Sequence, residues 1–213
     1  MNIKKTANLL LHFASKRLAE IFGIIIFSSG IMLLISLTTY SPEDPNFIFP
    51  DNIGIKNLLG FQGSFISDLF FQSIGLIAYL ISFTFILSGI NIFRFKEFFL
   101  IIENIFFVIL YCVFGSLFLS YFYSTDFALH INGSGGFVGN YLNQTFLNSL
   151  IKINEKLFYY FLIVFNLFLF LISINFSLKN FNSSTKKFIN LFTENNNKNY
   201  TNKTEVINEY LPQ

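Results

Sequence analysis

Four long stretches without Asp, Glu, Lys or Arg restrict the fold of this sequence more than any other feature. They cover residues 21–42, 69–93, 104–125 and 157–178. A helix of roughly 20 apolar residues crosses a bilayer core about 30 Å thick, since each residue adds about 1.5 Å. Backbone amides in lipid must be hydrogen-bonded within the segment, so each stretch is expected to be helical. The sequence therefore predicts an all-α membrane protein with four transmembrane helices.

The composition excludes most soluble functions. The 213 residues are 53% hydrophobic and 12% charged, compared with about 25% charged in a typical soluble domain. A formal net charge of +2 is too small for a protein that binds nucleic acid through a strongly basic surface. One Cys and two His cannot supply a four-ligand zinc site or a disulfide. We therefore expect no catalytic residue, no metal site and no cofactor in this chain.

Lys and Arg are unequally distributed among the predicted loops, and this indicates the orientation. Most lie in the N-terminal segment, in the short loop 94–103 and in the C-terminal tail, whereas the other two loops contain only Lys56, Lys152 and Lys156. Because cytoplasmic loops are enriched in Lys and Arg, both termini are predicted to be cytoplasmic. The first apolar stretch is longer than the core of a signal peptide and lacks a small-residue cleavage site. We expect it to be retained as a span.

These features divide the chain into three parts. Residues 1–17 combine apolar positions at helical spacing with Lys and Arg, which is typical of an amphipathic helix on the cytoplasmic leaflet. Residues 18–178 form the predicted transmembrane domain, and the Asn-rich and Lys-rich residues 179–213 are predicted to be a disordered cytoplasmic linker. Within the domain the spans are expected at about 20–39, 69–93, 104–123 and 157–178.

The two predicted external loops contain turn signals. In the first loop, Pro42 and Pro45 forbid continuation of the first helix. Further on, Ser64 is a plausible N-cap for the second span, with Asp68 in its opening turns. The second loop has a glycine-rich stretch that we interpret as a flexible turn. After it, apolar residues recur every four positions from 138 to 150, which predicts an external amphipathic helix on the outer leaflet or on the top of the bundle.

Few polar residues lie inside the predicted spans. Asn166 is the deepest amide, and we expect it to make an interhelical contact, as Asn91, Asn104 and Asn175 could nearer the span ends. A small transporter or channel subunit is the alternative function, because such proteins need polar groups at mid-depth. Asn166 and scattered Ser are the main candidates for that role, and no carboxylate lies at mid-span.

Several motifs occur in order within this topology. They are a Tyr-Ser-Pro-Glu-Asp-Pro turn, a Leu-Gly-x-x-Gly approach, a Ser-Asp-Leu helix start and a Gly-Gly-Phe-Val-Gly turn before the last span. In this arrangement the chain resembles the N-terminal four-helix membrane region of FtsK/SpoIIIE-type DNA translocases, over about residues 18–178. The residues that carry the resemblance are Tyr40, Ser41, Pro42, Asp44, Pro45, Gly60, Gly63, Asp68, Gly75, Gly135, Gly136 and Gly139.

The resemblance implies a non-enzymatic role in cell division and chromosome partition. In that family the membrane region anchors a linker and a hexameric, ATP-driven motor that pumps DNA through the closing septum of the bacterial inner membrane, and it contacts division proteins. The chain has no G-x-x-x-x-G-K-[ST] sequence to hold nucleotide phosphates. ATP, magnesium, DNA and a hexameric assembly are therefore expected only with a downstream motor. Either the sequence stops short of that motor, or the chain is a separate membrane protein.

Overall fold

The computed structural model describes residues 3–45, 54–96, 99–124 and 132–175, apart from the side chains of residues 3–7 and 99–103. Met1–Asn175 forms one compact unit, and a second unit, Phe176–Gln213, lies wholly outside the described residues. The predicted linker, 179–213, is therefore not described. Within the described ranges every regular element is a helix.

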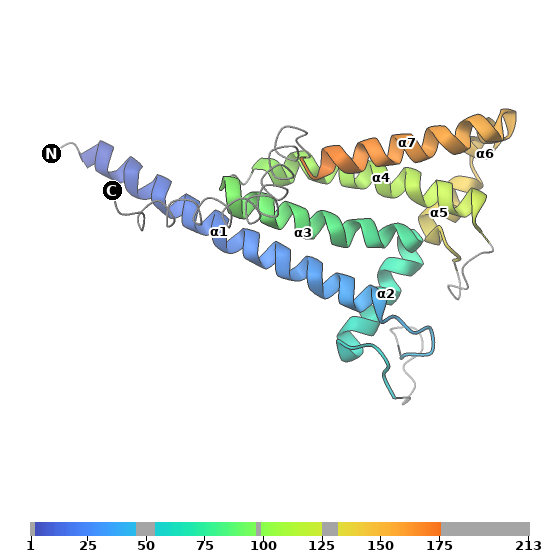
Figure 1. Ribbon diagram of the computed structural model, residues 1–213, viewed down its shortest axis with the longest axis horizontal. Helices are drawn as coiled ribbons and strands as arrows, with labels where there is room; N and C mark the ends of the chain where they lie inside the picture. The colour runs from blue at the N-terminus through green and yellow to red at the C-terminus, as the bar shows by residue number, and fades with distance from the viewer. Residues whose placement is uncertain (1–2, 46–53, 97–98, 125–131, 176–213) are drawn as a thin grey trace, which may run out of the picture. The chain divides into compact units, whose positions relative to one another are not determined.

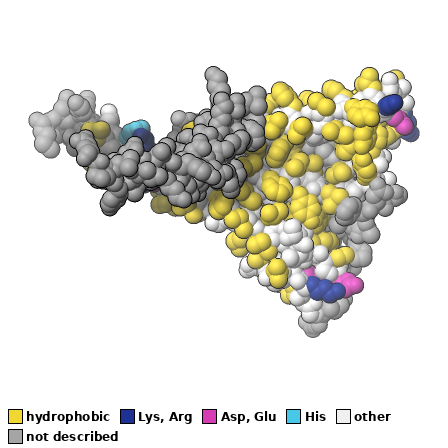
Figure 2. Space-filling view, viewed as in Figure 1, with side chains coloured by type: hydrophobic (Ala, Val, Ile, Leu, Met, Phe, Trp, Pro, Cys, Tyr) yellow, Lys and Arg dark blue, Asp and Glu magenta, His cyan; other side chains and the backbone are white. Residues whose placement is uncertain are grey.

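The described part of the chain contains four helical segments long and apolar enough to cross a membrane, which confirms the predicted fold class. They are Asn8–Thr38 in α1 (Ile3–Thr38), Gly60–Phe95 through α2 (Gly60–Ile74), η1 (Gly75–Ile77) and α3 (Ala78–Phe95), Asn104–Phe122 in α4 (Phe99–Phe122), and α7 (Glu155–Ser173). Large apolar side chains are exposed along all of them, and Figure 2 shows such side chains spread over one face. That surface needs lipid around it.

The first helix is continuous where a separate surface helix was predicted. α1 has 36 residues and runs without interruption from the predicted amphipathic segment into the first span. The boundary contains no Pro, and Arg17 pairs with Glu20 one turn later at 2.6 Å. Glu20 also pairs with Lys96, just after α3, at 2.5 Å. A helix of this length measures about 54 Å and exceeds the hydrocarbon core of a bilayer.

The spans pack as two pairs, α1 with α3 and α4 with α7 (Figure 1). In the first pair, Gly23 and Gly89 allow close contact, because a Cβ on Gly23 would lie 2.9 Å from the Gly89 carbonyl oxygen. In the second pair, the rings of Phe114 and Phe165 meet edge to face with centroids 5.1 Å apart. A central apolar cluster connects the pairs. Its buried members are Leu33, Leu37, Phe71, Ala78, Ile81, Tyr111, Cys112 and Leu169.

Amide side chains connect helices at the end where α1 begins and α7 ends: Asn91 of α3 bonds across to the other pair, and Asn175 bonds to Asn104 of α4 within the second pair. The Asn91 side chain donates to the Ile174 carbonyl oxygen at 2.8 Å, and that of Asn175 donates to Asn104 Oδ1 at 2.9 Å. These three amides make interhelical contacts of the kind expected for polar residues near span ends. We call this end the terminal end and the opposite one, which carries residues 39–45, 54–59, 123–124 and 132–154, the loop end.

The second span is broken at Gly75, where one helix over 69–93 was predicted. Gly75 has φ +66° and ψ −148°, a conformation that L side chains rarely adopt, and α2 turns away from α3 there (Figure 1). α2 begins at Gly60, so Ser64 lies inside the helix and is not its N-cap.

The single amphipathic helix predicted between 138 and 150 is also divided in two. α5 (Gly136–Asn143) ends before Gln144, and α6 (Phe146–Ile153) begins after Thr145. The Thr145 hydroxyl accepts a hydrogen bond from the Leu147 amide at 3.4 Å, as an N-cap does. The two polar residues Gln144 and Thr145 therefore separate α5 from α6, and Thr145 caps the new helix.

Candidate interaction surface at the loop end

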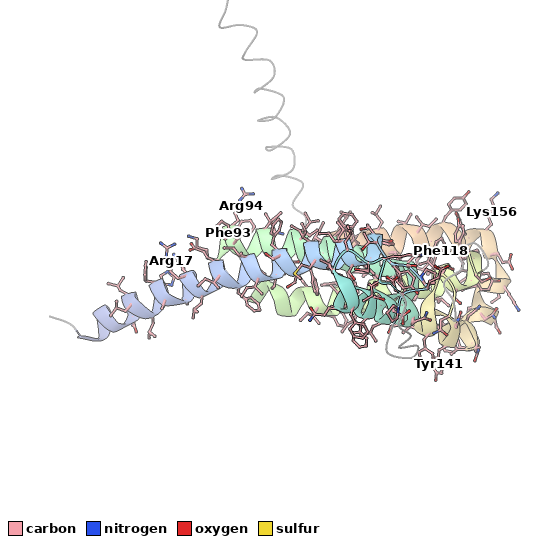
Figure 3. The ribbon with its side chains drawn as sticks, turned by 90° about the horizontal axis from the view of Figure 1, so that it is seen from below. Arg17, Phe93, Arg94, Phe118, Tyr141 and Lys156 are labelled. Atoms are coloured by element: carbon pink, nitrogen blue, oxygen red, sulfur yellow. The ribbon has the colours of Figure 1, made fainter. Side chains whose placement is uncertain are left out.

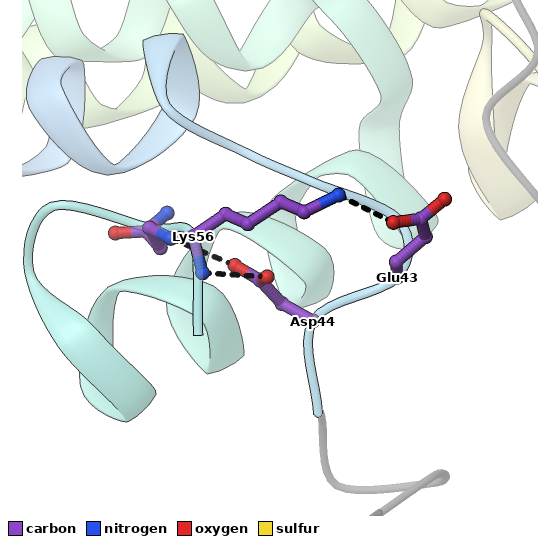
Figure 4. A network of polar contacts seen from close by, with 4 residues as sticks. Glu43, Asp44 and Lys56 are labelled. Carbon is purple, nitrogen blue, oxygen red and sulfur yellow. Dashed lines mark hydrogen bonds and ion pairs between the residues drawn. The ribbon is translucent and has the colours of Figure 1, made fainter. Parts of the chain in front are cut away.

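Asp44 closes the first loop. The turn that contains it is made by the Asp44 amide donating to the Ser41 carbonyl oxygen at 3.1 Å. Its carboxylate, only 4% exposed, accepts hydrogen bonds from the backbone amides of Lys56 at 2.8 Å and Asn57 at 2.9 Å (Figure 4). Charge-assisted bonds of this kind are the stronger ones in proteins. Asp44 therefore connects the turn after α1 to the segment that leads into α2.

An exposed ion pair lies beside this closure. The Lys56 side chain pairs with Glu43 on the solvent side of the loop (Figure 4). The Glu43 carboxylate raises the pKa of Lys56 above its ordinary value, through a hydrogen bond and through its charge. Both side chains are well exposed, so water weakens this pair far more than it weakens the buried Asp44 contacts.

Asn57 fastens the start of α2 to the end of α1. Its amide nitrogen donates to the Ser36 carbonyl oxygen at 2.9 Å, and its Oδ1 accepts from the Leu59 amide at 3.0 Å. The Ser36 hydroxyl donates in turn to the Gly63 carbonyl oxygen at 2.5 Å. A Cβ on Gly63 would lie 2.1 Å from Asn57 Oδ1, so the site has no room for a side chain there.

Tyr40 and Asp68 complete this group. The Tyr40 hydroxyl donates to Asp68 Oδ1 at 3.0 Å, and its ring meets that of Phe71 edge to face at 4.9 Å. Burial, followed by the Asp68 charge, raises the pKa of Tyr40 well above its ordinary value, so the phenol stays a donor. We call Tyr40, Asp44, Asn57, Gly63 and Asp68 the loop clamp.

A second group forms where the glycine turn meets the break in the second span. The Ser134 carbonyl oxygen accepts a hydrogen bond from the Leu76 amide at 2.9 Å, and a Cβ on Gly75 would lie 1.9 Å from that same oxygen. Gly136 has φ +65°, and a Cβ there would lie 2.5 Å from the Gly75 nitrogen. Backbone packs directly on backbone at this point.

The glycine turn also packs on α4. Cβ atoms on Gly135 and Gly139 would lie 2.5 Å and 2.2 Å from the Ser116 carbonyl oxygen. The Ser116 hydroxyl donates to the Ile74 carbonyl oxygen at 2.9 Å, one residue before the break. The backbone groups that lose their helical hydrogen bonds at the break in the second span are therefore hydrogen-bonded to the glycine turn and to α4. In an apolar environment such groups need a partner within the protein. We call Gly75, Ser134, Gly135, Gly136 and Gly139 the glycine junction.

The structure thus gathers eight of the twelve residues that carry the resemblance into these two groups at one end of the bundle. The other four, Ser41, Pro42, Pro45 and Gly60, lie at their margins. The Ser41 and Pro45 carbonyl oxygens accept hydrogen bonds from the Asp44 amide and the Ser64 hydroxyl, and the Gly60 amide donates to the Asn57 carbonyl oxygen at 2.9 Å. Pro42 is exposed in the turn. Sequence reasoning missed three serines whose hydroxyls donate to backbone, Ser36, Ser116 and Ser134. Ser36 and Ser116 lie within apolar runs, which is a signal for such contacts, whereas Ser134 lies in the glycine-rich turn and has no such signal.

Asn166 lies apart from both groups, at the packing surface between α7 and α4. Its amide nitrogen donates to the Leu162 carbonyl oxygen within its own helix at 2.9 Å, rather than across to a neighbouring helix. Its Oδ1 is buried without a hydrogen-bond partner and faces Gly115. Asn166 therefore contacts α4 by packing and not through a hydrogen bond between helices.

The loop end presents apolar side chains to its surroundings. Leu58 is 75% exposed and Phe61 50% on the clamp side, while Phe137 and Tyr141 of α5 stack on each other and are both more than half exposed. Within the described ranges no three His, Cys, Asp or Glu side chains come together as metal ligands would. The two groups at the loop end can fix the helices relative to one another, and the exposed apolar side chains beside them can form a contact surface.

The fold and these two groups define a multi-pass α-helical membrane protein whose second span is broken beneath a buried loop. The family described as the 4TM region of DNA translocase FtsK/SpoIIIE matches residues 15–185, and the chain belongs to that family. This confirms the resemblance seen in the sequence. Over 67 residues the chain is 30% identical to a protein named DNA translocase FtsK from Rhizobium meliloti (strain 1021), which covers 32% of this chain and 8% of that relative. No solved structure matches the chain.

Proposed function

We propose that this chain is the non-enzymatic membrane anchor of a cell-division DNA translocase. Membership of the FtsK/SpoIIIE 4TM family is the observation that supports it. In this proposal the terminal end faces the cytoplasm, in agreement with the excess of Lys and Arg there. Both termini then lie on the side of a DNA-pumping motor, which alone uses ATP and magnesium and alone contacts DNA. Confinement to the septal part of the bacterial inner membrane raises the local concentration of that motor. In this proposal the chain forms a hexamer only as part of the hexameric motor.

The loop end would contact division proteins outside the cytoplasm. The exposed apolar side chains of Leu58 and Phe61 support this role, because large exposed apolar residues next to a rigid polar closure are typical of protein contact sites. The clamp holds both residues beside the end of α1 through Asn57. A preformed surface of this kind binds without the cost of ordering a loop.

A fluorescent fusion of the full chain, expressed in dividing bacteria, tests the proposal. We expect signal at midcell, and we expect Phe61→Ser to disperse it around the envelope while membrane insertion persists. Phe83→Ser is the matched control, since Phe83 is 44% exposed along α3 and Phe61 50% exposed at the loop end. Uniform envelope signal from the unaltered chain contradicts the division role. Labelling of Cys introduced at positions 16 and 58 tests the orientation, with position 16 expected to be protected from impermeant reagents in intact cells.

A further inference from the structure

A group of tyrosines marks the level at which the second helix pair leaves the membrane. The hydroxyl groups of Tyr123 and Tyr159 are 2.7 Å apart, and Tyr121 donates to Glu155 Oε1 at 2.8 Å. These residues lie where α4 ends and α7 begins. Tyrosines concentrate at the boundary between acyl chains and headgroups. The loop end of α4 and α7 therefore lies at the headgroup level.

Helix α6 is held at this same level by its inner face. Ile151 is 2% exposed and packs with Leu117 of α4 and Leu162 of α7, and Leu147 lies against the same cluster. Asn154 begins α7 directly after α6, its Oδ1 accepting from the Leu157 amide at 3.1 Å. The position of α6 relative to the tyrosines is thus fixed by packing on both spans.

The outer face of α6 is also apolar. Phe146 is 72% exposed, Leu150 39% and Ile153 77%. Spacings of four and three residues place these side chains in one stripe along the helix. Leu157, in the first turn of α7, is exposed as well, and the exposed apolar side chains along α7 belong in lipid. Lys152 and Lys156 are exposed beside it, and Figure 3 shows Lys156 at the opposite edge of this end from Tyr141.

We propose that α6 is an interfacial helix that binds phospholipid in the leaflet at the loop end. The stripe of Phe146, Leu150 and Ile153 enters the upper acyl region, and the ammonium groups of Lys152 and Lys156 bind lipid phosphates. Lipid is the occupant because α6 is packed at the tyrosine level and is joined through Asn154 alone to α7, whose exposed side chains are apolar. A soluble protein could reach the stripe only by displacing headgroups. Such a helix holds α7 at a set depth and tilt through the short link at Asn154.

Depth-dependent quenching in vesicles tests the apolar part of the proposal. The full chain carrying Cys112→Ala is labelled with an environment-sensitive fluorophore at Phe146→Cys, Ile153→Cys or, as a control, Gln144→Cys in the exposed turn before α6. Circular dichroism checks that each variant is folded. Phospholipids brominated near the ester groups should quench the labels at 146 and 153 roughly twofold or more above the label at 144. Equal, weak quenching at all three positions overturns the proposal.

The lysines are tested by lipid charge. Quenching at position 153 should be greater in vesicles that contain phosphatidylglycerol than in vesicles of phosphatidylcholine alone. The double variant Lys152→Gln, Lys156→Gln should lose this difference, and Lys56→Gln, a control in the first loop, should keep it. A difference that survives the double substitution overturns the assignment of the phosphate contacts to these lysines. Both experiments use reconstituted protein, so failure of the division role at midcell leaves their outcome unaffected.

Discussion

The Tyr40 hydroxyl reaches across from the end of α1 to donate a 3.0 Å hydrogen bond to Asp68 Oδ1 inside α2. Asp68 is 8% exposed, and Gln72 Nε2 lies 3.5 Å from the same oxygen. A carboxylate placed on an otherwise apolar span thus has one donor from Tyr40, beyond the end of α1, and one from Gln72 in its own helix. The pairing explains how a charged residue is tolerated near the membrane boundary, since buried charge requires hydrogen-bond donors.

Removal of the Tyr40 hydroxyl should destabilise the protein. Tyr40→Phe keeps the ring against Phe71 but takes the donor from a buried carboxylate, which costs about 1–3 kcal/mol. The measurement is the free energy of unfolding in mixed micelles of a mild detergent and dodecyl sulfate. In a double-mutant cycle, Asp68→Asn should make the Tyr40→Phe change smaller. Additive effects of the two substitutions would show that the bond contributes nothing.

The Asp44 carboxylate should stabilise the first loop more than the carboxylate of the neighbouring Glu43 does. Asp44→Asn leaves one acceptor oxygen where two backbone amides now donate, so we expect lower stability and faster proteolysis of the first loop. Glu43→Gln is the matched control, because it removes one charge from an exposed pair and should change little. Limited proteolysis of the reconstituted protein measures both. Equal cleavage of the two variants would mean that the hydrogen bonds to Asp44 do not hold the first loop together.

The number of spans could be predicted because lipid imposes one rule on every helix that crosses it. Charged residues are costly inside the bilayer, so their absence over long stretches identifies α1, α3, α4 and α7 without tertiary information. The length of α1 could not be predicted in the same way, because Lys and Arg before the span are typical of a separate surface helix. In the structure Glu20 pairs with Arg17 in the same helix and with Lys96 just after α3.

The break in the second span could not be predicted for a related reason. Glycine is common in transmembrane helices, and nothing near Gly75 in the sequence forbids a straight helix. Glycine is required there because its φ is positive and because the Ser134 carbonyl oxygen, from a distant loop, lies 1.9 Å from where a Cβ would be. The motif resemblance found Gly75 and Gly136 but not Ser134, whose role depends on backbone atoms that any residue possesses.

Replacement of Asn166 by Leu should leave the protein equally stable or more stable. Its Oδ1 is buried without a hydrogen-bond partner and its nitrogen bonds only within α7, so little is lost and an unpaired acceptor is removed. Unfolding in mixed micelles measures the change, with Asn91→Leu as the control expected to destabilise by breaking the bond to the Ile174 carbonyl oxygen. Ion flux in proteoliposomes that Asn166→Leu abolishes would instead favour a channel subunit.

Two glycines with the same φ, Gly60 outside the glycine junction and Gly75 within it, test how much the close packing of the junction contributes to stability. Gly60 and Gly75 both have φ +66°, but a Cβ on Gly60 would meet nothing within 4 Å. Gly60→Ala should therefore cost only the strain of a positive φ, about 1–2 kcal/mol. Gly75→Ala adds a collision with the Ser134 carbonyl oxygen and breaks the hydrogen bond from the Leu76 amide, so its loss of unfolding free energy should be clearly larger. Because the junction joins the two helix pairs, Gly75→Ala should also increase exchange of the amides near Ser134, whereas Gly60→Ala should leave them protected. Equal unfolding free energies for the two variants would mean that the loop moves aside without cost and that the junction does not hold the pairs together.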